Sequence, residues 1–503
     1  MHITIIDTTL RDGEQTSGVA YTAGEKLHIS RLLLEEVKVD YIEVASARVS
    51  AGEMEAVKRI TEWAENTGHL EQVEVLTFID GEKSIEWIRE SGAKTANLLS
   101  KGSLKHLTKQ LRKTPEEHIS DIRNAVETLN QLGMKANIYL EDWSNGMRHS
   151  KDYVFFLLDG LRNLNFQRIM LPDTLGILTP DDTFDFCREV CQRYPDLHFD
   201  FHAHNDYDLA VANSLAAVKA GVKGIHATVN GLGERAGNAP LASIAAVLKD
   251  HTEVTTGINE EKLTLLSKMV ETFSGIRIPA NKPVVGENVF TQASGVHADG
   301  DNKDRLYYND LLPERFGRVR KYALGKTSGK SNILKNLEEL GIRLEPEAMQ
   351  RVTDRISELS DRKENVTSED LPYIISDVLQ NEGNEQHIRV HNYSLNVAEG
   401  LKSVATLSLE VEGAIYQETS AGDGQYDAFM NALRKIYLPL NRELPRLTDY
   451  VVTIPPGGRT DALVETVIRW QTADKHEFTT RGLDPDQTIS AIQATVKMLN
   501  IIR

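Results

Sequence analysis

The chain has 503 residues, of which 40% are hydrophobic and 26% are charged, and its formal net charge is −17. These proportions are typical of globular proteins, and the length exceeds the usual span of one hydrophobic core, so two or three folding units are expected. The negative charge argues against a surface that binds nucleic acid or an anionic membrane, because both need a broad positive field.

The N-terminal sequence MHITIIDTTLRDGEQ lacks the basic start, apolar stretch and cleavage site of a signal peptide. No apolar run is long enough to cross a bilayer, so no membrane contact and a cytoplasmic location are expected. The two cysteines, Cys187 and Cys191, lie four residues apart in a stretch that predicts a helix. A structural role for them fits the usual burial of cysteine.

Short apolar runs alternate with longer amphipathic stretches through the first half of the chain, which is typical of repeated βα units. Several runs are apolar at nearly every position, as expected of parallel strands covered on both faces. A doubly wound open sheet is the alternative, but no G-x-G-x-x-G turn follows the first run. We therefore predict an α/β fold with a (β/α)8 TIM barrel over residues 1–275. Its eight strands are expected at Ile3 to Thr9, Tyr41 to Ser46, Val73 to Phe78, Thr95 to Ser100, Lys135 to Glu141, Arg168 to Thr174, His198 to Asn205 and Gly224 to Gly231.

Polar side chains gather where these runs end. In TIM barrels the C-terminal ends of the strands form the mouth that carries the active site, so a site is expected there. The polar residues at or just beyond the strand ends are Arg11, Asp12, Glu43, Glu141, Thr174, His202, His204 and Asn230.

The sequence HAH predicts a metal site. His202 and His204 are two residues apart on the seventh run, so both imidazoles can face the mouth. Asp12 can add a carboxylate, and this ligand set leaves open positions for a substrate around a divalent ion such as zinc, manganese, cobalt or magnesium. Asn238, in GERAGN, is a candidate fourth ligand or supporting group, with simple loop hydrogen bonding as the alternative.

Arg11 adjoins the candidate ligand Asp12, which places a guanidinium beside the expected cation. An anionic ligand shared by both, such as a 2-oxo acid, would explain this arrangement, with Arg11 stabilising the developing oxyanion. The alternative is an ion pair between Arg11 and Glu14, Glu43 or Glu141.

Two further residues at the mouth have open roles. Glu141 is a candidate acid or base, or else a group that orients Arg11 or a metal-bound water. Thr174 could donate a hydrogen bond to a substrate carboxylate, or cap the turn that follows Pro172 and Asp173.

Beyond the barrel the pattern changes. The segment ENVFTQASGVHADGDNKDRLYYNDLLPERFGR has no clear period and predicts a long functional connection, followed by charged amphipathic helices. Residues 276–385 are expected to form helical linker subdomains that contribute to the active site. In residues 386–503 alternating runs flank the helical stretch YDAFMNALRKIY, which predicts a separate C-terminal α+β domain.

The segments LRDGEQTSGVAYT, FHAHNDYDLAVAN, HATVNGLGERAGNAPL and FTQASGVHADG resemble, in this order, the signatures of the 2-isopropylmalate, homocitrate and citramalate synthase family. The resemblance covers essentially the whole chain. The stretches YIEVASARVS, NIYLEDWSNG and LPDTLGILTP are similar to the bacterial (R)-citramalate synthase branch in particular.

The resemblance implies roles for residues throughout the chain. Asp12, His202 and His204 match the family's metal ligands, with Asn238 where some members add another. Arg11 matches the group that polarises the 2-oxo acid, and Glu141, His297, Thr174 and Tyr307 match its remaining site residues. Of these, Glu141 and His297 match acid/base residues, Thr174 matches a carboxylate contact, and Tyr307 resembles a tyrosine that reaches the site, although Tyr308 is adjacent.

The implied reaction is a condensation of acetyl-CoA with a 2-oxo acid, followed by hydrolysis of the thioester. Leu76, Leu99 and Tyr139 lie near the inward ends of the third to fifth runs, where bulky walls leave room for a methyl group and disfavour isopropyl. Pyruvate, giving (R)-citramalate for isoleucine biosynthesis, is therefore the expected acceptor, and ordinary barrel filling is the alternative interpretation of these side chains. The alternative functions are a 2-isopropylmalate synthase that uses 2-oxoisovalerate, a metal-dependent lyase or aldolase, and an amino-acid sensor with an inactive barrel.

The C-terminal domain resembles the family's regulatory domain, which implies a homodimer and an amino-acid effector, with isoleucine expected. Tyr426, Asp427 and Thr460 lie beside Gly-rich turns and are the candidate effector ligands. A dimerisation domain with ordinary turns is the alternative. The basic run RFGRVRKYALGK is either a contact for the CoA phosphates or a solvated face.

Overall fold

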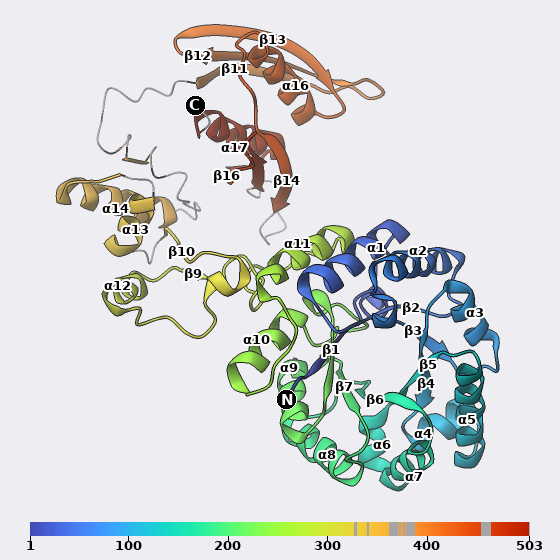
Figure 1. The fold of residues 1–503 in the computed structure, drawn as a ribbon. Coiled ribbons are helices and arrows are strands. Elements are labelled where there is room, and N and C mark those ends of the chain that lie inside the picture. The colour runs from blue at the N-terminus through green and yellow to red at the C-terminus, as the bar shows by residue number, and fades with distance from the viewer. Residues whose placement is uncertain are drawn as a thin grey trace. The chain divides into compact units, whose positions relative to one another are not determined.

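The computed structural model describes residues 1–325, 329–339, 342–361, 371, 374–375, 378, 388–453 and 464–501 (Figure 1). The chain divides into two compact units. The first consists of Met1–Phe290 and Tyr308–Arg320, and the second consists of Thr291–Tyr307 and the residues from Lys321 onward. The first unit holds the largest hydrophobic core, and the second holds two smaller ones, over residues 324–375 and 388–499.

Eight parallel strands close into a barrel in chain order, with β8 paired to β1. This confirms the predicted TIM barrel. The expected runs coincide with β2, β3 and β5, and the other five differ only at their ends. The strands are β1 (Thr4–Asp7), β2 (Tyr41–Ser46), β3 (Val73–Phe78), β4 (Thr95–Lys101), β5 (Lys135–Glu141), β6 (Phe166–Asp173), β7 (Phe199–Ala203) and β8 (Gly224–Ala227).

Helices follow the strands and surround the barrel (Figure 1). They are α1 (Ala23–Arg31), α2 (Ala51–Thr67), α3 (Lys83–Ser91), α4 (Leu104–His106), α5 (Pro115–Gln131), α6 (Trp143–His149), α7 (Lys151–Leu161), α8 (Pro180–Arg193), α9 (Ala210–Ala220), α10 (Leu241–His251) and α11 (Leu263–Ser274). Thr22, Thr114 and Thr179 begin α1, α5 and α8 with capping boxes, in which the threonine hydroxyl and an acidic side chain three residues later satisfy free backbone N–H groups.

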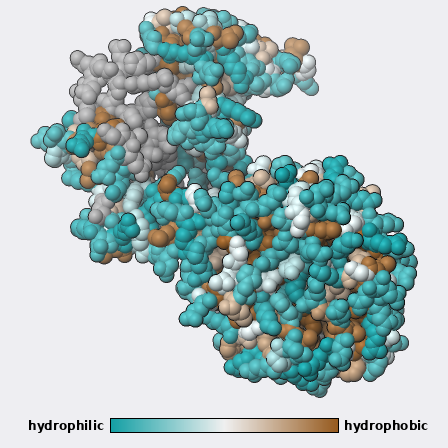
Figure 2. All heavy atoms as spheres, in the orientation of Figure 1, coloured by the Kyte–Doolittle hydropathy of each residue, from teal (hydrophilic) through white to brown (hydrophobic). Residues whose placement is uncertain are grey.

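The interior of the barrel is polar over much of its depth. Asn97 of β4 donates to Glu43 of β2, and Asn137 of β5 donates to Glu74 of β3. Because these hydrogen bonds join strands that are not neighbours, the side chains lie inside the barrel. Apolar residues on the opposite face of each strand pack beneath the helices, and the face of the barrel unit in Figure 2 is mostly hydrophilic with scattered apolar patches.

The second unit begins with short elements and ends with an α+β domain, which confirms that part of the predicted fold. In the C-terminal domain, two antiparallel three-stranded sheets are each followed by one helix, so a β-β-β-α arrangement occurs twice. The first elements are β9 (Thr291–Gln292), α12 (Gly295–Asp304), β10 (Lys321–Tyr322), α13 (Lys330–Glu339) and α14 (Pro346–Asp361). The C-terminal elements are β11 (Ile388–Asn396), β12 (Ser403–Val411), β13 (Ala414–Gly422), α16 (Gln425–Tyr437), β14 (Arg446–Thr453), β15 (Val464–Gln471), β16 (Glu477–Asp484) and α17 (Gln487–Ile501).

A search of the described part of the chain for helices long and apolar enough to cross a membrane finds none.

Candidate active site

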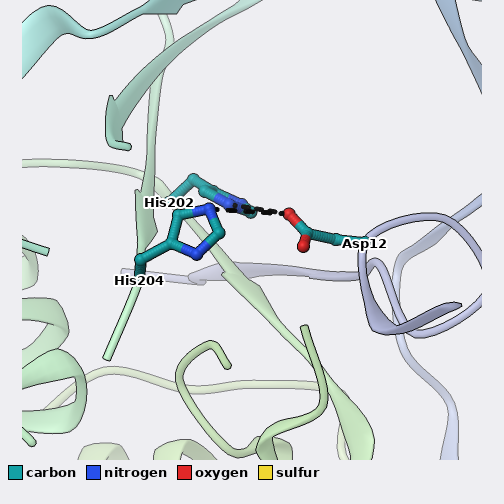
Figure 3. Close-up of side chains that lie close together, drawn as sticks. All are labelled: Asp12, His202 and His204. Carbon is teal, nitrogen blue, oxygen red and sulfur yellow. Dashed lines mark ion pairs between the residues drawn. The ribbon is translucent and has the colours of Figure 1, made fainter. Parts of the chain in front are cut away.

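Three potential metal ligands meet at the C-terminal end of the barrel. His202 lies on β7, His204 follows that strand directly, and Asp12 lies in the loop after β1. The Nε2 atoms of His202 and His204 are 3.2 Å and 3.8 Å from Oδ2 of Asp12. In Figure 3 both imidazoles turn toward the carboxylate, which approaches from the opposite side.

The geometry of this cluster fits a divalent cation. One ligand atom from each residue lies within 4.8 Å of the others, and all three residues are buried. Ligand atoms that bind one ion at about 2.1 Å stand roughly 3 to 3.5 Å apart, close to the separations seen here. Buried imidazole nitrogens aimed at a carboxylate are therefore arranged as a ligand set.

The protonation states also suit metal binding. Burial lowers the pKa of His202, and it lowers the pKa of His204 to about 4, so both rings are neutral near pH 7. Burial alone would raise the pKa of Asp12, but Arg11, followed by His202, outweighs it and holds this pKa well below its ordinary value. Neutral imidazoles and an ionised carboxylate are the forms that bind metals.

Asn238 lies beside the cluster, because it forms an isolated β-bridge with His204. Its Nδ2 donates to the carbonyl oxygen of Leu232 at 3.2 Å. Its Oδ1 is buried and has no hydrogen-bond partner among the described residues. An amide oxygen that is fixed but unsatisfied is suited to a ligand or to a ligand-bound water. The role of Asn238 as a ligand stays a prediction.

Arg11 sits in a network of buried partners. Its Nε donates to Oε2 of Glu43 at 2.5 Å, its Nη1 to Oδ2 of Asp12 at 2.9 Å, and its Nη2 to Oη of Tyr139 at 3.1 Å. Of the three carboxylates considered as ion-pair partners, the structure selects Glu43. The other two, Glu14 and Glu141, pair with Lys26 and Lys101. A guanidinium has five N–H groups, so two remain for a bound anion.

The three residues predicted to line the acceptor pocket lie together. Leu76, Tyr139 and Met170 form a buried cluster inside the barrel, and Leu99 packs against it. Tyr139 is not simply an apolar wall, since its hydroxyl contacts Arg11, Glu43 and Nδ1 of His226. The ring of Tyr139 also meets His202 edge to face, with 6.0 Å between centroids. The apolar cluster therefore directly adjoins the metal and arginine groups.

Glu141 and Thr174 occupy neighbouring strand ends. Glu141 forms an ion pair with Lys101, the last residue of β4. Glu141 was considered as a group that orients Arg11, but Glu43 is the residue that pairs with Arg11. The hydroxyl oxygen of Thr174 accepts a hydrogen bond from the backbone N–H of Asp142 at 2.8 Å. The hydroxyl proton of Thr174 remains available to a substrate, because this oxygen acts as an acceptor in that contact.

Asn230, expected at the end of the eighth strand, is not a site residue in the structure. The strand β8 ends at Ala227, and Asn230 lies in a short 3-10 turn with a positive φ of 59°. Its side chain donates to the carbonyl oxygen of Ser267 on α11. The turn ends the strand early because its backbone departs from the extended conformation.

The remaining predicted residues belong to the second unit. His297 on α12 stacks on Tyr307, with ring centroids 4.1 Å apart. Nδ1 of His297 lies 3.2 Å from Oε1 of Gln292, and Tyr307 is 40% exposed. These two residues thus form one local group, and the structure does not test their catalytic roles.

The candidate effector residues lie at the start of α16, apart from Thr460, which lies outside the described residues. Tyr426 shares a hydrogen bond of 2.7 Å with Thr495 of α17, and its ring lies 5.6 Å from that of Tyr450. Oδ2 of Asp427 accepts from the backbone N–H of Asp423 at 3.0 Å.

Sequence reasoning missed several charged groups around the site. Glu43 was one of three carboxylates considered as an ion-pair partner of Arg11, and no role was predicted for Lys26 or Lys101. A periodic signal existed for Lys101, which lies two residues after Leu99 and therefore faces the same side of β4. The pattern gave no such signal for Lys26, because its partners Glu14 and Glu53 are distant in sequence.

Three family models match successive parts of the chain. The HMGL-like model matches residues 2–270, the homocitrate synthase post-HMGL domain-like model matches residues 284–364, and the LeuA allosteric (dimerisation) domain model matches residues 365–503. Together they cover the barrel, the connecting region and the C-terminal domain.

Individual relatives match over nearly the full length. Two proteins of Methanopyrus kandleri align over 500 residues, or 99% of this chain. One carries the provisional name (R)-citramalate synthase and is 34% identical, with 96% of its own length covered. The other carries the provisional name 2-isopropylmalate synthase and is 35% identical, with 98% covered. A 2-isopropylmalate synthase of Pyrococcus furiosus is 34% identical over 512 residues, which span 100% of this chain and 99% of its own.

The match of the barrel model to more than half of the chain, and of relatives to almost all of it, agrees with the geometry of the site. The chain therefore belongs to the 2-isopropylmalate, homocitrate and citramalate synthase family of enzymes, which are metal-dependent and condense acetyl-CoA with a 2-oxo acid.

Proposed function

We propose that this enzyme condenses acetyl-CoA with pyruvate and water to give (R)-citramalate and CoA, a step in isoleucine biosynthesis. The observation that carries the choice of acceptor is the cluster of Leu76, Leu99, Tyr139 and Met170, which adjoins Arg11 and His202. A short methyl substituent fits beside such bulky walls better than an isopropyl group.

The reaction has three steps. Removal of a proton from the acetyl methyl group gives an enolate, whose carbon attacks C2 of the 2-oxo acid. The resulting alkoxide takes up a proton, and water then hydrolyses the thioester and releases CoA as the thiol. A divalent cation held by Asp12, His202 and His204, with Asn238 beside it, would supply Lewis-acid polarisation of the acceptor when bound.

The chain's own residues orient the acceptor and move the protons. The two free N–H groups of Arg11 donate to the oxygen on which negative charge develops, and Glu43 keeps the guanidinium in place. Thr174 donates to the acceptor carboxylate. In this proposal Glu141 and His297 act as acid and base, and Tyr307, stacked on His297, accompanies it into the site.

Each of the three expected parts of the chain has its own function in this proposal. Residues 1–275 carry the catalytic barrel, residues 276–385 contribute His297 and Tyr307, and residues 386–503 bind an amino-acid effector. We propose isoleucine as that effector and a homodimer as the assembly, supported by the match to the LeuA allosteric (dimerisation) domain. Tyr426, Asp427 and Thr460 are the proposed effector ligands.

The test is release of free thiol from acetyl-CoA with pyruvate, 2-oxobutanoate, 2-oxoisovalerate or 2-oxoglutarate as acceptor. We expect the highest kcat/KM with pyruvate and lower values as the acceptor side chain grows. Faster turnover of 2-oxoisovalerate than of pyruvate would favour the second candidate, a 2-isopropylmalate synthase, which relatives of similar identity also support.

The same assay tests regulation. Added isoleucine should lower the rate, whereas leucine at equal concentration should have less effect. Removing the residues after Glu385 should abolish inhibition by isoleucine, and unchanged inhibition in the shortened chain would contradict the proposed effector site.

A further inference from the structure

We infer that Lys101 is a positioning residue for Glu141, and that its ammonium group holds this carboxylate in a fixed orientation at the barrel mouth. The inference rests on the proposed function, in which Glu141 transfers a proton. It adds a residue to which neither the family signatures nor the comparisons assign a role.

The two residues are placed side by side by the sheet. The strands β4 and β5 pair in register without a bulge, and Lys101 and Glu141, the last residue of each, are register partners. Their side chains form an ion pair. Leu99 and Tyr139 are also register partners, two residues before Lys101 and Glu141 on their strands. They face the same side of the sheet as Lys101 and Glu141, because residues two apart on a strand share a face. Lys101 therefore stands directly above the proposed acceptor pocket.

The backbone of Lys101 is held from the helical layer. Its N–H donates to Nε2 of His118 on α5 at 3.2 Å, and its carbonyl oxygen accepts from the hydroxyl of Tyr153 on α7 at 2.7 Å. Burial lowers the pKa of His118 to about 4, so Nε2 is free to accept at neutral pH. These contacts anchor the lysine at the strand end.

The position of Lys101 is unusual for its residue type. It is only 5% exposed, whereas lysine is almost never buried without a partner. The side chain of Glu141 is 25% exposed and that of Lys101 is 7% exposed, so the carboxylate is more accessible than the ammonium.

Other charged groups near Glu141 have partners of their own. Arg11 pairs with Glu43 and Asp12. On the neighbouring loops, His106 of α4 lies 3.3 Å from Asp142 and Arg235 lies 2.9 Å from Asp206. Among the described residues, Lys101 is thus the cation paired with Glu141.

The test is a double-mutant cycle with Lys101→Met, Glu141→Gln and the double variant, together with Lys101→Arg and the control Lys105→Met. Lys105 is an exposed lysine on α4, four residues away. For each protein, thiol release gives kcat and KM, and metal content and Tm are measured separately.

We expect Lys101→Met to lower kcat about 100-fold with unchanged metal content. Lys101→Arg should restore most of the rate, and Lys105→Met should match the parent. In the Glu141→Gln background, Lys101→Met should change kcat less than about 3-fold, because the group it positions is gone. The double variant leaves no buried charge unpaired, so it keeps the cycle measurable if Lys101→Met alone does not fold.

Equal losses of kcat on replacing Lys101 in the parent and in the Glu141→Gln background would overturn the inference. A fall in metal content that parallels the fall in kcat would also overturn it, since that would show a general structural role. If the parent enzyme releases no thiol with any 2-oxo acid, the proposed function fails and this inference with it. If the parent releases thiol but the effects of Lys101→Met and Glu141→Gln are additive, the role of Lys101 is rejected and the proposed function stands.

Discussion

Glu43 and Arg11 form a buried ion pair at the centre of the site, with 2.5 Å between Oε2 and Nε. The side chain of Glu43 is fully buried and that of Arg11 is 9% exposed. The pair balances the guanidinium charge, so that Asp12 is not its sole carboxylate partner. Asp12 thereby remains available to the metal site.

Replacing Glu43 with Gln should therefore weaken both stability and metal binding. We expect a loss of about 3 kcal/mol in the free energy of unfolding, because the buried Arg11 loses one of its two carboxylate partners. Arg11 would then compete with the metal for Asp12, and metal affinity should fall about 10- to 100-fold. Urea denaturation and calorimetric titration with Mn²⁺ measure the two effects.

The matched control is Glu35→Gln, which removes a carboxylate from the exposed i,i+4 pair with Arg31. Exposed pairs contribute less than about 1 kcal/mol, so this variant should resemble the parent in both measurements. An equal effect of the two substitutions would contradict the special role assigned to Glu43.

Removal of His204 should empty the metal site. We predict that His204→Ala loses most of its bound divalent metal and nearly all of its thiol-release activity, and that a chelator has the same effect on the parent. Elemental analysis after dialysis gives the metal content per chain. His149→Ala, an exposed histidine at the end of α6, is the control and should keep its metal. Full metal content in His204→Ala would exclude the proposed ligand set.

Lys26 should stabilise the loop that carries Arg11. Its fully buried ammonium lies 2.6 Å from Glu14 and 2.7 Å from Glu53, and it donates to the carbonyl oxygens of Leu10 and Val44 at 3.1 and 3.3 Å. Lys26→Met leaves two carboxylates without this cation, so we expect a loss of about 3 to 5 kcal/mol in unfolding free energy.

Lys249→Met provides the comparison for Lys26. Lys249 is 60% exposed and pairs with Glu260 at 2.5 Å, so its loss should cost less than about 1 kcal/mol. Chemical denaturation of both variants decides the question, and similar costs would show that Lys26 has no special anchoring role.

Asp7 should make stability depend on pH. Burial raises its pKa to about 7, against an ordinary value of 3.8. Between pH 4 and 7 the unfolded chain has released this proton while the folded protein retains it, so stability falls as pH rises, by at most about 1.4 kcal/mol per pH unit. Asp7→Asn cannot ionise, and its Oδ1 can still accept from the backbone N–H of Thr9, a contact of 2.9 Å in the parent.

The unfolding free energy of Asp7→Asn, relative to that of the parent, should therefore increase as pH rises from 4 to 7. This difference should level off above about pH 8. Urea denaturation at several pH values measures it. The exposed Asp152→Asn on α7 is the control, and its difference from the parent should stay nearly constant over this range. A flat difference for Asp7→Asn would show that its carboxyl ionises normally.

Leu99 should contribute to the choice of acceptor. Leu99→Ala enlarges the proposed pocket, so the ratio of kcat/KM for 2-oxobutanoate over pyruvate should rise about 10-fold or more. Leu98→Ala removes the neighbouring side chain on the opposite face of β4, which packs in the outer core. That variant should lose stability while keeping the parent ratio, and equal ratios in both variants would place the acceptor elsewhere.

Much of the barrel and the metal cluster was predictable from local patterns. The alternation of short, largely apolar runs with longer amphipathic stretches located the eight strands, because this pattern is typical of repeated βα units. The rule that active sites lie at the C-terminal ends of barrel strands then placed Asp12, His202 and His204 together before their distances were known. His204 lies just beyond β7, yet the spacing of two residues still brought both imidazoles to the cluster.

The partners of the charged residues were not predictable in the same way. Glu43, Glu14 and Glu141 were equivalent candidates for Arg11 in the sequence, and only the closed barrel shows that Glu43 binds it while Lys26 and Lys101 take the others.

The sequence by itself determined the barrel, the positions of its strand ends and the residue types that a metal-dependent condensation needs. The barrel and its strand ends follow from local periodicity, which depends on near neighbours along the chain, and the condensation was implied by the resemblance to the synthase family. The tertiary structure alone decided which carboxylate balances Arg11, that Tyr139 turns its hydroxyl toward Arg11 and His226, and that Lys101 stands beside Glu141. Ion pairs inside a closed barrel depend on register and on the path of strands around the ring, and a linear pattern of residues does not contain that information.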